Sequence, residues 1–317
     1  MARTPRMSKK EKLTLLADIE DGYRPFDKHA LTLLRSLLDD TDAEVRAEAI
    51  ACLWNDPDPK WIAVLMKKAT EDVHADVRAH AISALGRYVF EGEAASYEDW
   101  DGHEIAITPE DYVRVSEFLF RIAQDPEEAL EARRYAIEAL AFRTDDPEVL
   151  DLIEWAYLHR DRRLKVSALF AMARNGDPKW TDYILTELRS EDPEIQYEAV
   201  RAAGELGLHE ATDLLIEIAK SKGVRKPLRL LAIYALGETG DERAYPVLDR
   251  FTHSRDRDVR EVAREAIEEW FAVSAIEQMA DETLDEEDDE ESPYSQALQF
   301  DGLPDIWADP TQTFSKN

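Results

Sequence analysis

The sequence predicts an all-α protein built as an α-solenoid of about seven helix pairs. Three observations lead to this prediction: a motif that returns at a nearly constant interval, repeated helix-start signals, and a helix-favouring composition. Only 11 of the 317 residues are Gly, and 34% are charged. This composition disfavours an all-β fold, which needs frequent turns. Because two short helices cannot bury both of their apolar faces alone, the pairs are expected to stack around one shared core.

The repeated motif is an apolar residue, a residue that is usually basic, two variable positions, then Ala followed by an aliphatic residue. Its clearest copy runs from Asp42 to Leu53. The anchor alanines of the seven copies are Ala49, Ala81, Ala136, Ala168, Ala199, Ala232 and Ala263. Five of the six intervals between them are 31 to 33 residues long, and the second is 55 residues long. The long interval predicts an insertion at about 91–107 in an otherwise regular array.

Each period contains two amphipathic segments. In the second segment the apolar residues recur at i, i+4, i+5 and i+8, which places them on one helix face. Asp before Pro marks helix starts, because Asp can cap free backbone N–H groups and Pro suits the first turn. The predicted starts are at Asp58, Asp125, Asp146, Asp177 and Asp192. The sequence Asp-Pro-Lys-Trp at 58–61 recurs at 177–180, which indicates duplication.

The array is predicted to have a different segment at each end. Residues 1–27 are expected to form a basic lead and a capping helix, 28–272 the solenoid, and 273–317 an acidic, disordered tail. Nine of the eleven residues from 281 to 291 are acidic, and such a run repels itself. Apolar residues follow between 294 and 314. The tail is therefore expected to be inert, to dock on a partner, or to fold back onto the groove of the array.

The repeated motif resembles the HEAT repeats, and it is most similar to the short form named after phycobilisome lyases. The resemblance covers roughly residues 28–272. It implies that the second helix of each pair lines a concave face and that the recurring basic residue pairs with Asp in a ladder. The implied ladder residues are Arg46, Arg78, Arg133, Lys165, Arg229 and Arg260. Gln196 departs from this pattern, as do His74 and Arg225 where the preceding Asp is expected.

The charge balance argues against general nucleic-acid binding. The formal net charge is −30, with 39 Lys and Arg against 69 Asp and Glu, whereas a phosphate-binding protein needs the opposite balance. An acidic chain favours a protein partner with a basic patch. The single cysteine, Cys52, allows no disulfide within the chain and is expected to be a small buried residue. No apolar run long enough for a membrane span or signal peptide is found, so a cytoplasmic protein is expected.

A stripe on the second helices predicts a partner-binding surface. Positions one before, two after and six after each anchor Ala lie on one helix face, beside the apolar stripe. Aromatic residues and Arg are enriched at interface hot spots. The predicted partner-binding residues, including one adjacent position, are Tyr135, Glu138, Phe142, Phe170, Arg174, Tyr197, Arg201 and Tyr234. The alternative is that these rings pack against neighbouring helices, because sequence does not define the rotation of each helix.

The leading functional prediction is a non-catalytic scaffold or adaptor whose concave face binds a peptide or helix of a partner. No cofactor and no metal site are predicted, because no phosphate loop, nucleophile elbow or acid–base constellation stands out. The resemblance leaves two enzyme alternatives open. One is tetrapyrrole attachment or a related chaperone role, as in the phycobilin lyases. The other is a hydroxylase like deoxyhypusine hydroxylase, whose metal-binding His-Glu pairs have counterparts only at 103–104 and 209–210.

Overall fold

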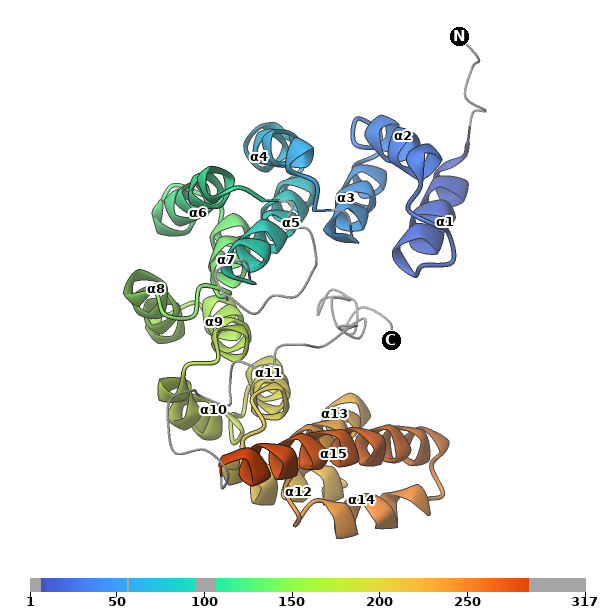
Figure 1. Ribbon diagram of the computed structural model, residues 1–317, viewed down its shortest axis with the longest axis vertical. Coiled ribbons are helices and arrows are strands. Elements are labelled where there is room, and N and C mark those ends of the chain that lie inside the picture. The colour runs from blue at the N-terminus through green and yellow to red at the C-terminus, as the bar shows by residue number, and fades with distance from the viewer. Residues whose placement is uncertain (1–6, 56, 95–106, 285–317) are drawn as a thin grey trace. The chain divides into compact units, whose positions relative to one another are not determined.

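The computed structural model describes residues 7–55, 57–94 and 107–284. These residues form α-helices, short 3-10 turns and loops, and no strand occurs among them (Figure 1). The chain divides into two compact units, with unit 1 ending at Leu214 and unit 2 starting at Leu215. The predicted all-α solenoid of seven helix pairs is confirmed, since the seven pairs run from α2 and α3 to α14 and α15.

Unit 1 holds α1 and five complete helix pairs. Its helices are α1 Lys9–Glu20, α2 Lys28–Leu37, α3 Ala43–Ala51, α4 Ile62–Glu71, α5 Ala75–Ala94, α6 Pro109–Gln124, α7 Leu130–Leu140, α8 Pro147–Leu158, α9 Arg162–Asn175, α10 Thr181–Glu187 and α11 Pro193–Glu205. The first helix of each pair packs on the second, and each second helix contacts the next second helix along the chain. The second helices lie on the inner side of the curve that unit 1 follows, while α1 packs against α3 (Figure 1).

Unit 2 continues the same architecture. Its helices are α12 Thr212–Lys220, which starts at the end of unit 1, α13 Lys226–Glu238, α14 Tyr245–Thr252 and α15 Arg257–Leu284. Helix α15 packs against both α13 and α14. The approach to α13 is close enough to require glycine, because a Cβ on Gly237 would lie 2.2 Å from the carbonyl oxygen of Ala266.

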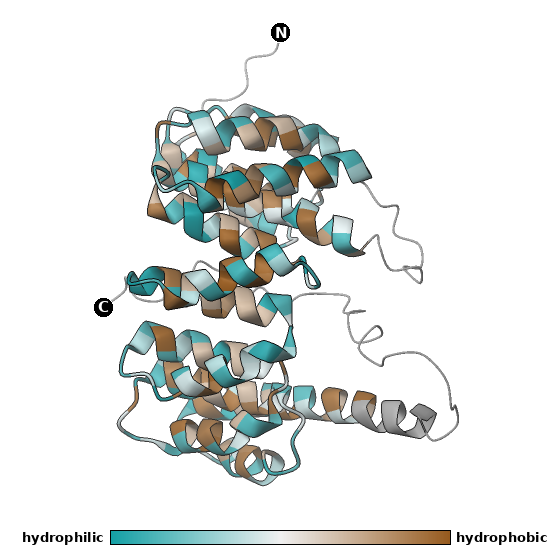
Figure 2. Cartoon of the chain, turned by 90° about the vertical axis from the view of Figure 1, so that its left-hand side faces the viewer, coloured by the Kyte–Doolittle hydropathy of each residue, from teal (hydrophilic) through white to brown (hydrophobic). Residues whose placement is uncertain are grey.

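The repeat motif forms the core. All seven anchor alanines have 0% of their surface exposed, as expected where neighbouring second helices meet. Apolar and polar residues alternate along each helix in the pattern of one buried face (Figure 2). Cys52 is buried, as predicted, and its Sγ donates to the carbonyl of Leu16 at 3.5 Å.

Most predicted helix starts are confirmed by their cap contacts. The Asp146 and Asp192 side chains accept from the amides of Glu148 and Glu194 at 2.8 Å and 3.0 Å. Such a cap typically stabilises a helix by about 1 kcal/mol. The duplicated Asp-Pro-Lys-Trp sequences form matching 3-10 turns, η2 Pro59–Trp61 and η3 Pro178–Trp180. At the other end of a helix, Gly176 closes α9 in the left-handed conformation with φ 72°.

One predicted start is wrong. Asp125 follows the last residue of α6 instead of opening a helix, and its carboxylate accepts from the amide of Glu127 at 2.9 Å. This contact holds a turn, so that α7 begins only at Leu130. A side-chain cap therefore also stabilises a turn that does not continue into a helix.

Two predicted segments fall partly or wholly outside the described residues. The insertion placed at 91–107 overlaps the end of α5 at Ala94, and residues 95–106 lie outside the described part. The tail boundary placed at 272 falls inside α15, which continues to Leu284. The remainder of the predicted tail, 285–317, lies outside the described residues.

Candidate protein-binding surface on the inner helices

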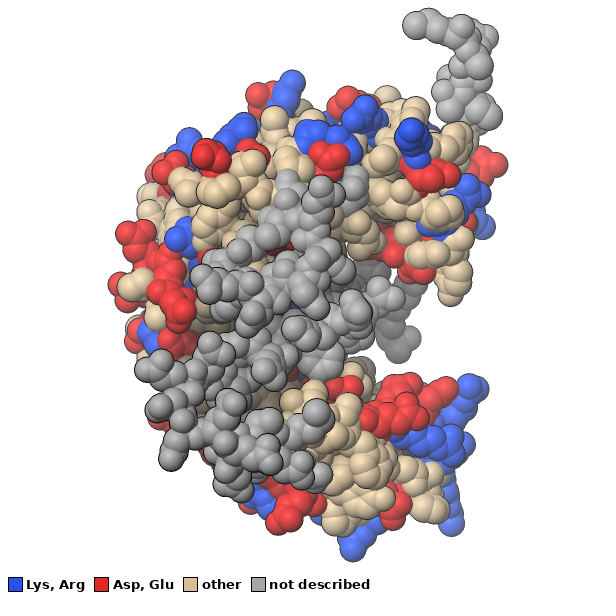
Figure 3. Space-filling model, in the orientation of Figure 1, with Lys and Arg blue, Asp and Glu red and all other residues tan. Residues whose placement is uncertain are grey.

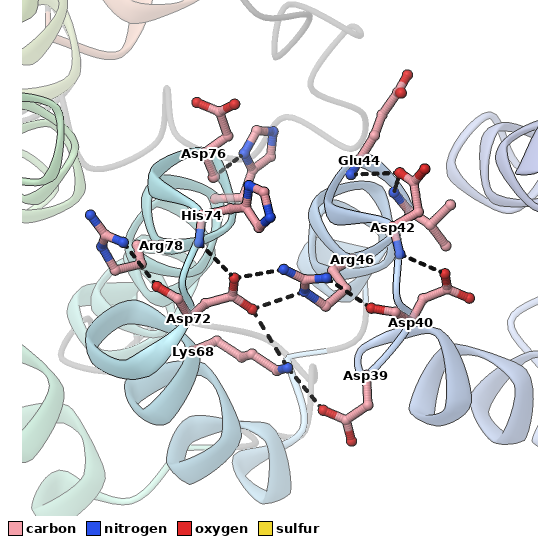
Figure 4. A network of polar contacts seen from close by, with 12 residues as sticks. Asp39, Asp40, Asp42, Glu44, Arg46, Lys68, Asp72, His74, Asp76 and Arg78 are labelled. Carbon is pink, nitrogen blue, oxygen red and sulfur yellow. Dashed lines mark hydrogen bonds and ion pairs between the residues drawn. The ribbon is translucent and has the colours of Figure 1, made fainter.

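Arg46 forms the ion pair that the ladder prediction anticipates. Its Nε and Nη2 donate to the two carboxylate oxygens of Asp72 at 2.9 Å and 2.7 Å, and its Nη1 donates to the carbonyl of Asp40 at 2.8 Å (Figure 4). Burial alone would raise the pKa of Asp72, but hydrogen bonds from Arg46 and the amide of His74 hold it below its usual range. Asp72 follows the last residue of α4, so this pair joins two consecutive repeats.

The other ladder positions form a different contact. In five further copies the side chain donates to a main-chain carbonyl at the end of the preceding helix. These contacts are Arg78 to Asp72 at 2.8 Å, Arg133 to Ala123 at 3.0 Å, Gln196 to Leu188 at 2.9 Å, Arg229 to Ala219 at 2.9 Å and Arg260 to Ser254 at 2.8 Å. The last carbonyls of a helix lack partners within it. The side chain at this position therefore satisfies the carbonyl end of the first helix in its own pair.

A continuous Arg–Asp ladder does not form among the described residues. Asp72, which accepts from Arg46, lies six residues before Arg78, the basic residue of the next copy. Asp occupies that place only in the first two copies, as Asp40 and Asp72. Gln196 fits the array in spite of its missing charge, because a carbonyl needs only an N–H donor, which an amide supplies.

Lys165 forms another polar link between repeats. Its Nζ lies 2.9 Å from Oε1 of Glu187 on α10 and 4.4 Å from the centre of the Tyr157 ring on α8. The hydroxyl of Tyr157 donates to the same Glu187 oxygen at 2.6 Å. One buried carboxylate thus joins the repeat of α8 and α9 to the next one.

Phe170 on α9 lies at the centre of the predicted binding stripe. The guanidinium of Arg201 on α11 lies 4.6 Å from the centre of its ring, and that of Arg174 lies 5.4 Å away. Both are within the range of a cation–π contact. The structure therefore brings together three of the predicted residues, contributed by two neighbouring inner helices.

Two glutamates hold these guanidinium groups in place. Arg201 Nε donates to Glu198 Oε1 at 2.8 Å, and Arg201 also pairs with Glu205. Arg174 Nη2 lies 3.6 Å from the same Glu205 oxygen. Burial opposes the charge of Arg201, which is only 8% exposed, but Glu198 and Glu205 outweigh this and raise its pKa. The cluster is a fixed array of charges, since each long side chain is held by a partner.

Glu138 extends this cluster to α7. Desolvation raises the pKa of Glu138 to about 7, although Arg134 and a hydrogen bond with Ser167 favour its charged form. Arg134 Nε also donates to Ser167 Oγ at 2.9 Å. A carboxyl with this pKa changes its charge near neutral pH, so the charge of the inner surface depends on pH there.

We expect Glu138→Gln to remove a pH-dependent loss of stability. The raised pKa means that the folded state keeps this proton up to about pH 7, while the unfolded chain loses it near 4.5. The stabilisation that the folded state gains by binding this proton more tightly is fully present below pH 4.5 and is lost as the pH rises through 7. Between pH 5 and pH 8 the native chain should lose on the order of 2 kcal/mol relative to the variant. Urea unfolding at both pH values measures this difference.

Glu131→Gln on the same helix is the matched control, because the Glu131 side chain is 42% exposed. Its pH dependence should follow that of the native chain. Equal pH dependence of the native chain and Glu138→Gln would contradict the raised pKa.

The remaining predicted residues differ in their surroundings. Tyr135 and Tyr197 are half-buried on α7 and α11, and Tyr197 lies near the cluster: burial and Glu198 raise its pKa, while Arg201 lowers it. Phe142 follows the end of α7, and its ring packs edge-on against Phe90 at 5.4 Å, so part of its surface serves packing. Tyr234 belongs to unit 2, where burial and nearby glutamates raise its pKa to about 12.

Ser167 and Glu198, two of the residues that hold the cluster, are absent from the predicted binding residues. Both occupy the position one before the anchor Ala, which is one of the positions that define the stripe. Selecting for aromatic residues and Arg omitted them. A search for opposite charges three or four residues apart would have found the pairing of Arg201 with Glu198 and Glu205.

Of the His-Glu pairs considered for enzyme chemistry, only one lies in the described part of the chain. His209 and Glu210 lie exposed in the 3-10 turn η4 His209–Ala211, and residues 103–104 lie outside the described part. Within the described ranges, no group of three His, Cys, Asp or Glu side chains is arranged to hold a metal ion. No helix of the described chain has the length and apolar character needed to cross a membrane.

The repeats of this chain match a known family. The family model for HEAT repeats matches residues 31–98, 152–226 and 181–268, together more than half of the chain. No curated protein matches the chain.

Solved structures also match the chain, each with low identity and a TM-score below 0.5. Human deoxyhypusine hydroxylase in complex with glycerol is 18% identical, with 85% of this chain and 93% of that chain covered and a TM-score of 0.38. The complex of CpcE and CpcF of phycocyanin lyase from Nostoc is 15% identical, with 84% and 89% covered and a TM-score of 0.46. Kap121p bound to Nup53p is 14% identical, with 84% and 32% covered and a TM-score of 0.43.

Proposed function

The chain belongs to the HEAT-repeat family, and from this premise we propose that it is a non-catalytic scaffold that binds a segment of a partner protein. The binding surface is the inner side of unit 1, formed by α7, α9 and α11. The observation that carries the proposal is the cluster around Phe170, where two guanidinium groups lie over one aromatic ring and are held by Glu198 and Glu205.

A preformed cluster of this kind favours binding for an energetic reason. Ordering a long side chain on association costs about 0.5–1.5 kcal/mol. Arg201 and Arg174 are already held by acidic partners in the free chain, so that much of this cost is avoided. The aromatic rings and Arg supply the side chains that dominate interface energies.

The charge of unit 1 favours a partner segment with basic residues. Residues 1–214 hold 27 Lys and Arg against 45 Asp and Glu, a net charge of −18, whereas residues 215–284, to the end of α15, hold eleven against fourteen, a net charge of −3. The acidity of the folded chain is thus concentrated in the unit that carries the proposed surface. Opposite charge on a partner would speed its association and favour its orientation.

The test is capture of a partner by the immobilised chain, followed by mapping of the contact. We expect hydrogen exchange of α7, α9 and α11 to slow when the captured protein is bound. Phe170→Ala combined with Tyr197→Ala should reduce affinity by tenfold or more, because hot-spot truncation costs about 2 kcal/mol or more.

The matched control removes two side chains from α8 in the outer layer. Trp155 and Leu158 are 38% and 70% exposed, and the double variant Trp155→Ala, Leu158→Ala should bind as the native chain does. Circular dichroism verifies that both variants remain folded. Loss of binding with the outer variant and not with the inner one would contradict the proposed surface.

A further inference from the structure

Unit 2 carries an exposed basic edge in an otherwise acidic protein. Residues 220–264 contain eleven Lys and Arg against seven Asp and Glu, while the whole chain has a net charge of −30. Exposed members at the end of α12 and near the starts of α13 and α15 include Lys220, Lys222, Lys226, Arg255 and Arg257, which we name the basic edge. Lys and Arg side chains gather over the end of unit 2 where α15 begins (Figure 3).

Ion pairs hold the two halves of the basic edge together. Lys226 at the start of α13 lies 2.9 Å from Asp256 and 2.7 Å from Asp258 in the segment that opens α15. Arg257 lies 3.5 Å from Glu261 one turn along its own helix. Both loops are therefore fixed side by side. These pairs neutralise Lys226 and Arg257, so the positive charge that the edge offers to a ligand comes from Lys220, Lys222 and Arg255. Such a surface favours an anionic polymer as its ligand.

The chain itself contains a segment of matching charge. Nine of the eleven residues from 281 to 291 are acidic, and none is basic. At 0.15 M salt the screening length is about 8 Å. An acidic segment bound at the basic edge is therefore attracted by the nearby cations, while salt screens its repulsion from acidic side chains farther away.

Chain length prevents this acidic run from reaching the basic edge of its own molecule. The edge lies at the N-terminal end of α15, and the run begins at the other end of that helix. At 1.5 Å per residue, the helix from Arg257 to Leu284 is about 40 Å long. Residues 285–291 span at most about 24 Å when fully extended, which is too short to return along the helix.

We propose that the basic edge binds the acidic run of a second copy of this chain. The contact is head-to-tail, because the edge and the run lie at opposite ends of α15. A contact of this type leaves an edge and a run free on the outer copies, so association can continue beyond the dimer. The inference concerns unit 2 and does not depend on the binding surface proposed for unit 1.

Sedimentation velocity of the full chain at 0.15 M and 0.5 M salt tests this proposal. We expect association that increases with protein concentration at 0.15 M salt and weakens at 0.5 M salt. The edge variant Lys222→Glu, Arg255→Glu should need at least about tenfold more protein to associate. The control variant Lys10→Glu, Lys67→Glu makes the same change in net charge on exposed side chains of unit 1 and should associate as the native chain does.

A second measurement identifies the occupant. A fluorescent peptide of residues 281–291 should bind the native chain and the control variant, and lose at least about tenfold in affinity for the edge variant. A native chain that remains monomeric at every concentration overturns the proposal, whether or not the peptide binds. Equal association of the edge and control variants also overturns it. If vesicles with 30% phosphatidylserine bind the native chain as tightly as the peptide does, the ligand of the basic edge is a lipid surface and the proposal is wrong.

Discussion

Replacement of Arg201 by Ala is expected to lower the free energy of unfolding by about 3–5 kcal/mol. Arg201 is the buried cation between Glu198 and Glu205, whose side chains are only 4% and 12% exposed. Removing it leaves two carboxylates in a desolvated site, with Arg174 at 3.6 Å from Glu205. Breaking a buried pair costs much more than the net stabilisation the pair supplies, because the remaining charge has lost both water and partner. Urea unfolding near pH 7 measures the change.

Arg163→Ala is the control for this prediction. Arg163 also contacts two acidic side chains, Glu131 at 2.8 Å and Asp161 at 3.0 Å, but its own side chain is 45% exposed. Solvent screens these pairs, so the loss should be about 0–1 kcal/mol. Similar losses for Arg163→Ala and Arg201→Ala would show that burial of the cluster does not determine its energy.

Trp180→Ala is the second replacement with a large expected effect, again a loss of about 3–5 kcal/mol. Trp180 is completely buried in η3, and its Nε1 donates to Asn175 Oδ1 at 2.8 Å. Asn175 in turn donates through Nδ2 to carbonyls beyond the end of α7, at 3.1 Å for Arg143 and 3.3 Å for Ala141. The variant therefore loses a large apolar contact and leaves a buried amide oxygen without its donor.

Trp180→Phe separates these two contributions. The phenyl ring keeps most of the apolar contact but lacks the N–H donor, so the loss should be about 1–3 kcal/mol. Thermal or urea unfolding of both variants measures the two losses in the free energy of unfolding. A larger loss for Trp180→Phe than for Trp180→Ala would be inconsistent with a site dominated by apolar burial.

The fold was predictable because its determinants are local and repeated. The anchor alanines recur at a constant spacing and are all fully buried, so a single motif defines the buried face of seven helices. Caps such as Asp146 and Asp192 act within two residues. The false helix start at Asp125 has the same local basis, since an Asp that caps a turn and an Asp that caps a helix accept the same amide contact.

The contacts of the candidate surface were less predictable because they join residues distant in sequence. The approach of Phe170 and Arg201 depends on how α9 rotates against α11, and spacing along one helix does not define that rotation. The ladder expectation failed beyond Arg46 for a related reason. A basic side chain reaches whichever acceptor its neighbours present, and after the first copy that acceptor is a carbonyl or, for Lys165, a glutamate.

The carbonyl contacts of the repeat bear on how such an array can change during evolution. In six copies, including that of Arg46, the donor and the carbonyl belong to the same helix pair. A gene duplication or deletion of one period would therefore carry each of these bonds with it intact. Side-chain links between repeats, such as Arg46 with Asp72, Arg134 with Ser167 and Lys165 with Glu187, lose a partner when such an event alters their junction. The carbonyl bonds would therefore survive a change in the number of repeats, whereas the links between repeats would have to form anew.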